Sequence, residues 1–255
     1  MRGQVAALFR SAGFRRVWAS GVANGATRWL EFTAVALFVF QQTGSPFLTA
    51  LTATLRLVPM ALFGPVMGIL ADALGARRVY LGLTLAMVAT FAVQAGLALT
   101  GRLDLWVVLV GCFVSGVYWS TDFPVRRTLL GAVTGEALAG PALIQDSLAN
   151  NVTRMLGPML GGVLLSVAGI AGVMIFGGGA SVLAFALVLR LKGAGRVARP
   201  ATSVRASPLD RFARDLREGL RIARTTPAAL LVLAITIVFS HISLATSRVV
   251  AFFAE

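Results

Sequence analysis

The chain has 255 residues, of which 57% are hydrophobic and only 13% are charged, and its mean hydropathy is +0.84. A soluble domain carries about twice that share of charged residues. The composition therefore argues against a soluble protein and indicates an all-α integral membrane protein.

The net charge of +13 does not indicate a nucleic-acid-binding protein, because the basic residues fall in short clusters between apolar spans. That placement is typical of the positive-inside bias of membrane proteins. One cysteine, Cys112, and one histidine, His241, supply no disulfide framework and no nucleophile–base set. We therefore expect no nucleic-acid partner, no enzyme activity, no metal and no cofactor.

The sequence predicts a basic tail and then six membrane helices. Residues 1–16 carry four arginines and no acid, which is typical of a cytoplasmic tail. Apolar runs near the bilayer-spanning length of about 20 residues follow. The predicted helices cover residues 17–40, 47–70, 79–99, 105–121, 137–167 and 170–189. Pro124 is expected to break or kink the fourth helix near its cytoplasmic end.

A basic stretch and a further apolar span follow the sixth predicted helix. Residues 190–226 contain ten Lys and Arg. Within them, Ser207 and Pro208 suit the start of a helix, and apolar residues from 209 to 223 recur at helical spacing. We expect an amphipathic helix on the inner leaflet, with a partner-binding helix as the alternative. A seventh transmembrane helix is predicted at 228–247.

These patterns divide the chain into four parts. They are an N-terminal tail (1–16), a six-helix transmembrane bundle (17–190), a basic cytoplasmic linker (191–226) and a seventh helix with a short end (227–255). The tail, the turns after the second and fourth spans, and the long stretch contain four, two, two and ten Lys and Arg, whereas the other turns contain only Arg102. This bias predicts a cytoplasmic N-terminus in a bacterial-type inner membrane, with the lipid bilayer as a partner.

Several charged side chains fall inside apolar spans, where each costs about 2.5–3.5 kcal/mol at the bilayer centre. Such residues usually face a cavity or an ionic partner. They and their polar neighbours are therefore predicted to line a central cavity for a substrate or for protons: Asn24, Arg28, Glu31, Arg56, Asp146, Asn150 and Arg154.

The pairing of these charges has alternatives. Arg28 and Glu31 share a helical face, and either form an ion pair with each other or respond to a substrate or a proton. Between helices, Arg56 is the expected partner of Asp146, and Glu31 of Arg154. Asp122, near the end of the fourth predicted helix, is expected to be a solvated loop acid.

Two glycine-containing motifs are predicted to govern conformational change. The first is a hinge, Gly68-x-Leu70-Ala71-Asp72-x-x-Gly75-x-Arg77-Arg78. Its second glycine permits a turn with positive φ, and its arginines hold the turn on the cytoplasmic side. The second motif is Gly157-Pro158-x-x-Gly161-Gly162, whose small residues let helices approach closely.

These motifs resemble the major facilitator superfamily. The hinge is similar to that family's loop between helices 2 and 3, and the second motif to the one that marks its drug and metabolite exporters. The segments 14–18, 44–46 and 123–127 are similar to the branch that includes enterobactin exporters. The resemblance implies a six-helix N-terminal bundle built as a 3+3 inverted repeat, followed by helix 7 alone.

The resemblance implies a secondary active transporter that exports a small amphipathic molecule, such as a drug or siderophore, by alternating access. Many proton-coupled exporters of the family, which are antiporters, carry an arginine in helix 4, and the predicted fourth helix has none. Proton coupling is therefore left open, unless Arg28 or Arg154 serves. The chain resembles the first part of a transporter, so a missing C-terminal half or a second chain is expected. One alternative is a non-transporting membrane fragment or assembly subunit that needs a partner chain, and another is homodimerisation into a full transporter.

Overall fold

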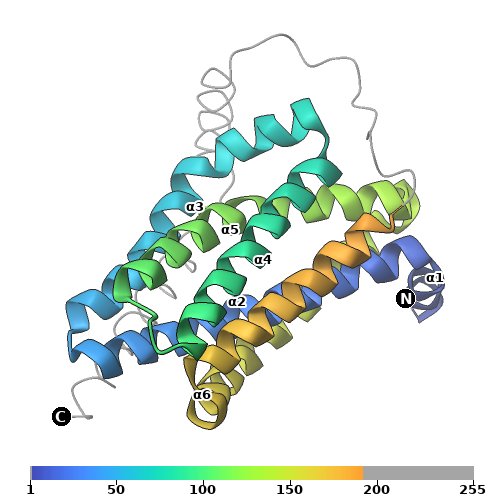
Figure 1. Ribbon diagram of the computed structural model, residues 1–255. Coiled ribbons are helices and arrows are strands. Elements are labelled where there is room, and N and C mark those ends of the chain that lie inside the picture. The colour runs from blue at the N-terminus through green and yellow to red at the C-terminus, as the bar shows by residue number, and fades with distance from the viewer. Residues whose placement is uncertain (1, 192–255) are drawn as a thin grey trace, which may run out of the picture. The chain divides into compact units, whose positions relative to one another are not determined.

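The computed structural model describes residues 2–191, and every element in this range is an α-helix (Figure 1). The predicted amphipathic helix and seventh transmembrane helix lie outside the described residues. The helices of the described range are α1 (Arg2–Arg10), α2 (Ala12–Thr43), α3 (Pro46–Leu74), α4 (Ala76–Leu99), α5 (Leu105–Thr134) and α6 (Glu136–Leu189).

Local capping chemistry sets the ends of the first long helices. The Ser11 hydroxyl accepts a hydrogen bond from the Phe14 amide at 3.3 Å, which starts α2 inside the predicted tail. Gly44, with a φ of 61°, ends α2 in the left-handed conformation. The next residue, Ser45, caps α3, whose first position is Pro46.

Helix α5 continues through Pro124 to Thr134, so the prediction that the helix ends at Thr121 was wrong. A proline removes one backbone hydrogen bond, but membrane helices tolerate it because neighbouring groups satisfy the freed carbonyl. The turns beyond the proline are held by packing, since Val125 and Leu129 are both buried. The extension places two further arginines on α5 that the sequence had suggested lay in a loop.

Helix α6 consists of two helical arms that meet at Gly169. The φ of 64° and ψ of −173° at this residue are not helical, and such values favour glycine. The two arms correspond to the predicted helices 137–167 and 170–189, so these two predictions agree with the structure.

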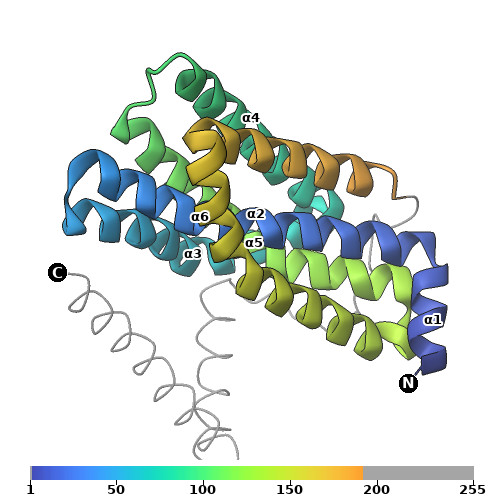
Figure 2. The ribbon, with the colours of Figure 1, turned by 90° about the horizontal axis from the view of Figure 1, so that it is seen from below.

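Four of the described helices are long and apolar enough to cross a membrane: α3 over Pro46–Gly64, α4, α5 and α6. Helix α2 has 32 residues but is less apolar, because it carries charged residues that include Arg28 and Glu31. It packs mainly against α6, α3 packs mainly against α5, and α4 packs against both α6 and α5 (Figure 2). Helix α5 is the most buried of the four candidate spans.

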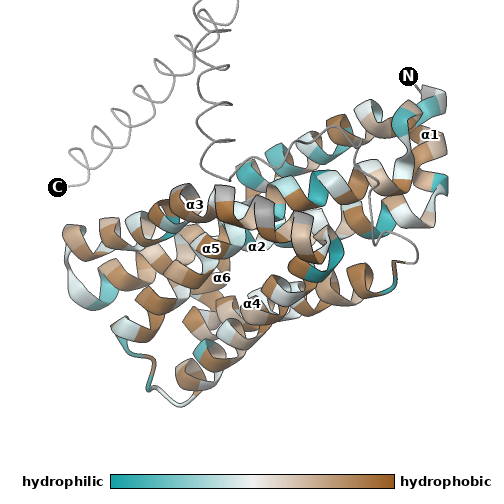
Figure 3. Cartoon of the chain, turned by 90° about the horizontal axis from the view of Figure 1, so that it is seen from above, coloured by the Kyte–Doolittle hydropathy of each residue, from teal (hydrophilic) through white to brown (hydrophobic). Residues whose placement is uncertain are grey.

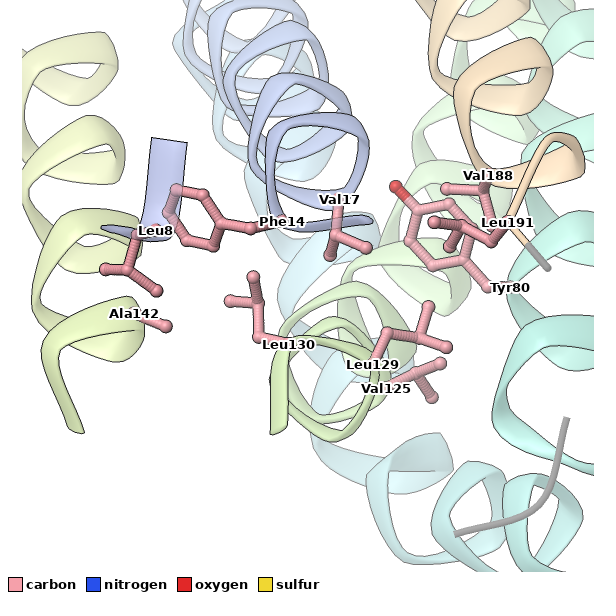
Figure 4. Packing of buried hydrophobic residues seen from close by; sticks show 10 residues of the cluster. All are labelled: Leu8, Phe14, Val17, Tyr80, Val125, Leu129, Leu130, Ala142, Val188 and Leu191. Atoms are coloured by element: carbon pink, nitrogen blue, oxygen red, sulfur yellow. The ribbon is translucent and has the colours of Figure 1, made fainter. Parts of the chain in front are cut away.

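One end of this bundle, which we call the basic end, gathers α1, the start of α2, the α3–α4 turn and the last turns of α5 and α6. Buried apolar side chains hold it together, including Leu8, Phe14, Val17, Leu130 and Val188 (Figure 4). Hydrophilic residues are prominent near α1 at this end (Figure 3). The predicted tail thus contains a helix, α1, whose Leu8 is fully buried.

Candidate functional site

Six charged side chains lie buried in the interior of the described helices, three acids and three arginines. No more than a tenth of any of these side chains is exposed. Because the charges come from four helices, the network joins those helices to one another. Its members are Arg28 and Glu31 of α2, Arg56 of α3, Asp122 and Arg126 of α5, and Asp146 of α6.

The first part of the network joins α3 to α2. The Arg56 guanidinium donates a hydrogen bond to the Glu31 carboxylate at 2.7 Å, and the two side chains are 0% and 4% exposed. Gly116 of α5 makes room for Arg56, because a Cβ at Gly116 would lie 2.8 Å from the Arg56 Cα. Closely packed backbones and a buried ion pair therefore occur at the same crossing.

Asp122 is the centre of the second part. Its carboxylate accepts a hydrogen bond from Arg28 at 2.8 Å and lies 3.6 Å from the Arg126 Nε. Asn24 and Tyr118 also donate to it, each at 3.5 Å. Asp122 is only 2% exposed, so the expectation of a solvated loop acid was wrong. The reason is the continuation of α5 past Pro124, which keeps this turn inside the bundle.

Arg126 extends the network to α6, where its guanidinium donates to the Asp146 carboxylate. It rests against Gly21 of α2, where a Cβ would lie 2.9 Å from the guanidinium carbon. The inference that this span has no arginine was therefore wrong, because α5 contains Arg126 as a buried residue. Its i,i+4 spacing from Asp122 is the sequence signal from which a shared helix face could have been inferred.

The expected ion pairs differ from those in the structure. Arg56 pairs with Glu31 rather than with Asp146, and Arg28 pairs with Asp122 rather than with Glu31. Asp146 is paired with an arginine of α5. The sequence placed Arg28, Glu31, Arg56 and Asp146 on the right helices but did not give the rotation of one helix against another.

Neutral polar groups continue the network toward the basic end. The Asn24 amide donates to the Tyr80 hydroxyl at 2.6 Å, and Tyr80 lies 3.3 Å from the Ser20 hydroxyl. All three side chains are buried. Tyr80 was not among the predicted site residues, because an aromatic residue in an apolar run resembles an ordinary core residue.

An aromatic layer covers one side of the charged network. The rings of Trp29, Phe32 and Trp119 lie 6.0–6.4 Å apart between centroids. The Arg28 guanidinium lies 5.0 Å from the Trp119 centroid, and the Arg154 guanidinium lies 5.2 Å from that of Trp29. These distances are typical of cation–π contacts.

Two further predicted cavity residues, both on α6, are less enclosed than the network. Arg154 is exposed and Asn150 is half-buried. The expected pair between Glu31 and Arg154 is absent from the ion pairs of residues 2–191, because the Glu31 carboxylate turns to Arg56 instead. Arg154 therefore lies at the edge of the network rather than inside it.

Several buried polar atoms of the network have no hydrogen-bond partner within the described residues. They comprise one carboxylate oxygen each on Glu31 and Asp146, Nε atoms of all three buried arginines, Nη1 of Arg56 and the Trp29 indole nitrogen. An unpartnered buried polar atom is costly, and it often marks a place for water, a proton or a ligand. Residues 2–191 contain no cluster of acids, histidines and cysteines that could hold a metal ion.

The hinge between α3 and α4 lies at the basic end. Gly75 has a φ of 90°, in accord with the predicted positive-φ turn. Arg77 donates to the carbonyl oxygens of Val188 and Leu189 at 3.3 and 2.7 Å, whereas Arg78 is exposed. The surroundings of the Gly68 and Asp72 side-chain positions lie outside the described part of the structure.

The second glycine motif brings α6 close to α2. A Cβ at Gly157 would lie 3.1 Å from the Leu30 amide nitrogen, and one at Gly161 would lie 3.1 Å from the Leu30 carbonyl carbon. Pro158 between them is half-buried. Small residues at a helix crossing allow this close approach, as the sequence predicted.

Comparison with known proteins identifies the family. A sequence model described as "Transmembrane secretion effector" matches residues 4–254. Macrolide efflux protein A of Streptococcus pyogenes is 21% identical over 212 residues, which are 83% of this chain and 51% of that protein. An uncharacterized MFS-type transporter of Bacillus subtilis, YfiS, is 26% identical over 231 residues, or 88% of this chain and 52% of that protein. The chain thus spans about half the length of these relatives. It belongs to the transmembrane secretion effector family of the major facilitator superfamily, which consists of membrane transporters rather than enzymes.

Proposed function

We propose that this chain supplies the first helical bundle of a secondary active transporter that exports a small amphipathic molecule by alternating access. Its family membership and its similarity to a macrolide efflux protein support this function. The structural observation that carries the proposal is the buried six-charge network that joins α2, α3, α5 and α6.

The network suits a bundle that moves as one unit. Alternating access rocks one bundle against another around a central site. The ion pairs link helices that are distant in sequence, since Arg28 and Asp122 are separated by 94 residues. Because three positive and three negative charges are enclosed together, the interior carries charge without a net imbalance. Such cross-links favour a rigid bundle with a polar face toward the substrate path.

Proton coupling is part of the proposal. Glu31 and Asp146 each have one carboxylate oxygen without a partner, and each carboxylate contacts an arginine. A carboxylate that gains a proton releases its arginine, so protonation would loosen one contact between two helices. Arg126 on α5 supplies the arginine whose absence left proton exchange open at the level of sequence. An antiporter that exchanges protons for the exported molecule agrees with this arrangement.

The proposed location is the bacterial inner membrane, with the N-terminus in the cytoplasm. Within residues 2–191, the arginines at helix ends and turns gather at the basic end, while Arg102 lies in the α4–α5 turn at the opposite end. This asymmetry favours a cytoplasmic basic end. The arginines of that end include Arg10, Arg15, Arg16, Arg77, Arg78, Arg127 and Arg190.

The proposal is tested by efflux from an efflux-deficient bacterium that expresses the gene as it occurs in its genome. A panel of fluorescent amphipathic compounds and macrolides is loaded, and the rate of loss from the cells is measured. We expect faster loss of at least one compound, and impaired loss with Glu31→Gln. Arg127→Gln is the matched control, because this arginine is exposed and forms none of the ion pairs of residues 2–191.

Two outcomes separate the proposal from its alternative. Loss of a compound only when a second bundle is co-expressed would assign the chain to an assembly subunit that needs a partner. No efflux of any compound with either arrangement, despite normal membrane insertion, would contradict the transport function.

A further inference from the structure

Among residues 2–191, the accessible charges that stack on the aromatic layer belong to arginines. Arg154 is exposed and its guanidinium lies 5.2 Å from the Trp29 centroid. The Arg28 side chain is 10% exposed and lies 5.0 Å from the Trp119 centroid. The two indole rings are themselves 6.4 Å apart. We call these four contiguous side chains the arginine–tryptophan face.

The acids near this face are less accessible to a ligand than its arginines are. Glu31, Asp122 and Asp146 are 4%, 2% and 1% exposed, and each contacts an arginine of the network. A molecule that approaches from the exposed side therefore meets guanidinium groups before it meets any of the three carboxylates.

The unused hydrogen-bonding capacity of the face consists of donors. The Trp29 indole N–H and the Arg28 Nε–H are both buried and have no acceptor among residues 2–191. Arg154 forms no ion pair within the same residues. The exposed Arg154 guanidinium, the Arg28 Nε–H and the Trp29 indole N–H thus lie within one cluster of donors, while Nη2 of Arg28 already donates to Asp122. An oxyanion is the ligand that satisfies such a set.

Charge balance leads to the same class of ligand. Adding Arg154 to the six-charge network gives four arginines against three acids. Arg154 lies about 27 Å along α6 from Glu136, taking 1.5 Å per residue, which places it well inside the span. An uncompensated charge at that depth is costly, so a bound anion would stabilise it. The stacked indole holds the guanidinium plane, which suits bidentate binding of a carboxylate, sulfonate or phosphate.

We propose that the arginine–tryptophan face binds the oxyanion group of an amphipathic organic anion, whose apolar part lies against Trp29. This inference rests on the proposed function, because it names the chemical class of the molecule that the transporter would carry. The anionic group could belong to a soluble molecule or to a lipid headgroup, and the two sources share the same recognition chemistry.

The test compares three probes that share one ring system and differ in charge. Naphthalene-2-sulfonate is the anion, naphthalene-2-sulfonamide the neutral compound and 2-naphthylmethylammonium the cation. Binding to the full chain in nanodiscs of phosphatidylcholine is measured by equilibrium dialysis. We expect the anion to bind at least fivefold more tightly than either of the other probes.

Three variants locate the binding. Arg154→Gln is expected to weaken anion binding about tenfold, and Trp29→Phe, which keeps a ring but removes the N–H, about threefold. Arg127→Gln is the matched control, since Arg127 is exposed and is not part of this face. Its guanidinium instead stacks on Phe123, 4.5 Å from the ring centroid. It should leave binding unchanged. Equal or tighter binding of the cation, or an Arg154→Gln protein with undiminished preference for the anion, would overturn the proposal.

A lipid arm separates the two sources of the anion. In nanodiscs that contain phosphatidylglycerol, a headgroup in the site would compete and weaken sulfonate binding at least fivefold, and Arg154→Gln would abolish this difference. Unchanged sulfonate binding would assign the site to soluble anions.

Efflux distinguishes this inference from the proposed function. Efflux with no dependence on substrate charge contradicts the anion site alone, whereas anion binding without efflux of any compound contradicts transport alone.

Discussion

Arg56 and Glu31 form a buried ion pair at 2.7 Å that joins α3 to α2. Arg56 Nη1 and Nε and one Glu31 oxygen have no further partner within the described residues. Both side chains of the pair therefore retain hydrogen-bonding atoms that are not used. Because the pair is buried, each charge depends on the other as its counter-charge.

Removing one member of this pair should destabilise the protein more than removing both. Arg56→Gln leaves the Glu31 charge buried without its partner, which typically costs about 3–5 kcal/mol. The double variant Arg56→Gln/Glu31→Gln should recover part of that loss. Thermal unfolding in detergent, followed by a thiol-reactive dye, measures this directly, because Cys112 is the single cysteine and is buried. A double variant no more stable than Arg56→Gln would show that the buried charge is not the cause.

Neutralising Asp122 should affect stability and efflux together. Asp122→Asn removes the carboxylate that Arg28 and Arg126 both face, so two buried guanidiniums lose a counter-charge. We expect a lower unfolding temperature and an efflux rate reduced at least fivefold. Asp104→Asn is the control, because Asp104 is exposed in the α4–α5 turn. Similar effects of the two substitutions would contradict a special role for the buried carboxylate.

Two alanine substitutions on α5 should have opposite signs. Alanine is normally favoured over glycine in a helix by about 1 kcal/mol. At Gly131 a Cβ meets nothing within 4 Å, so Gly131→Ala should be neutral or stabilising. At Gly116 a Cβ would lie 2.8 Å from the Arg56 Cα, and backbone cannot move aside as a flexible side chain can. Gly116→Ala should therefore lower the unfolding temperature, and an unchanged value would refute the close approach of α3 to α5.

The hinge supplies a prediction about rate rather than stability. Asp72→Asn is expected to slow efflux while membrane insertion stays normal, because the acid belongs to the predicted gating motif Gly68–Arg78. Initial efflux rates and the amount of protein in the membrane fraction are measured on the same cells. Wild-type rates at equal expression would argue against gating by this residue.

Much of the helical layout follows from hydropathy and glycines. The α4 end at Leu99 and the start of α5 at Leu105 agree with the sequence, since a polar turn separates two apolar runs. The interruption of α6 at Gly169 also agrees, because the predicted helices end and begin on either side of that glycine. These features depend on local chemistry, which a single sequence contains.

The identity of the ion-pair partners does not follow from the sequence. Pairing depends on how each helix is rotated about its axis, and that rotation is set by packing between distant residues. The error at Asp122 has a separate cause, because Pro124 suggested a helix end that the surrounding bundle overrides. The i,i+4 spacing of Asp122 and Arg126 was present in the sequence, but only the continuation of α5 makes it meaningful.

The arginines at the basic end connect the hinge to the last turn of α6. Arg77 donates to the Val188 and Leu189 carbonyls, and Arg16 donates to the Arg190 carbonyl at 2.8 Å. These bonds join residues separated by 111 or more positions in the chain. A pull applied beyond residue 191 would therefore act on the start of α2 and on the α3–α4 turn together. The turn and the exit of the chain are mechanically coupled, so a load on one would be felt by the other without passing through the charged interior.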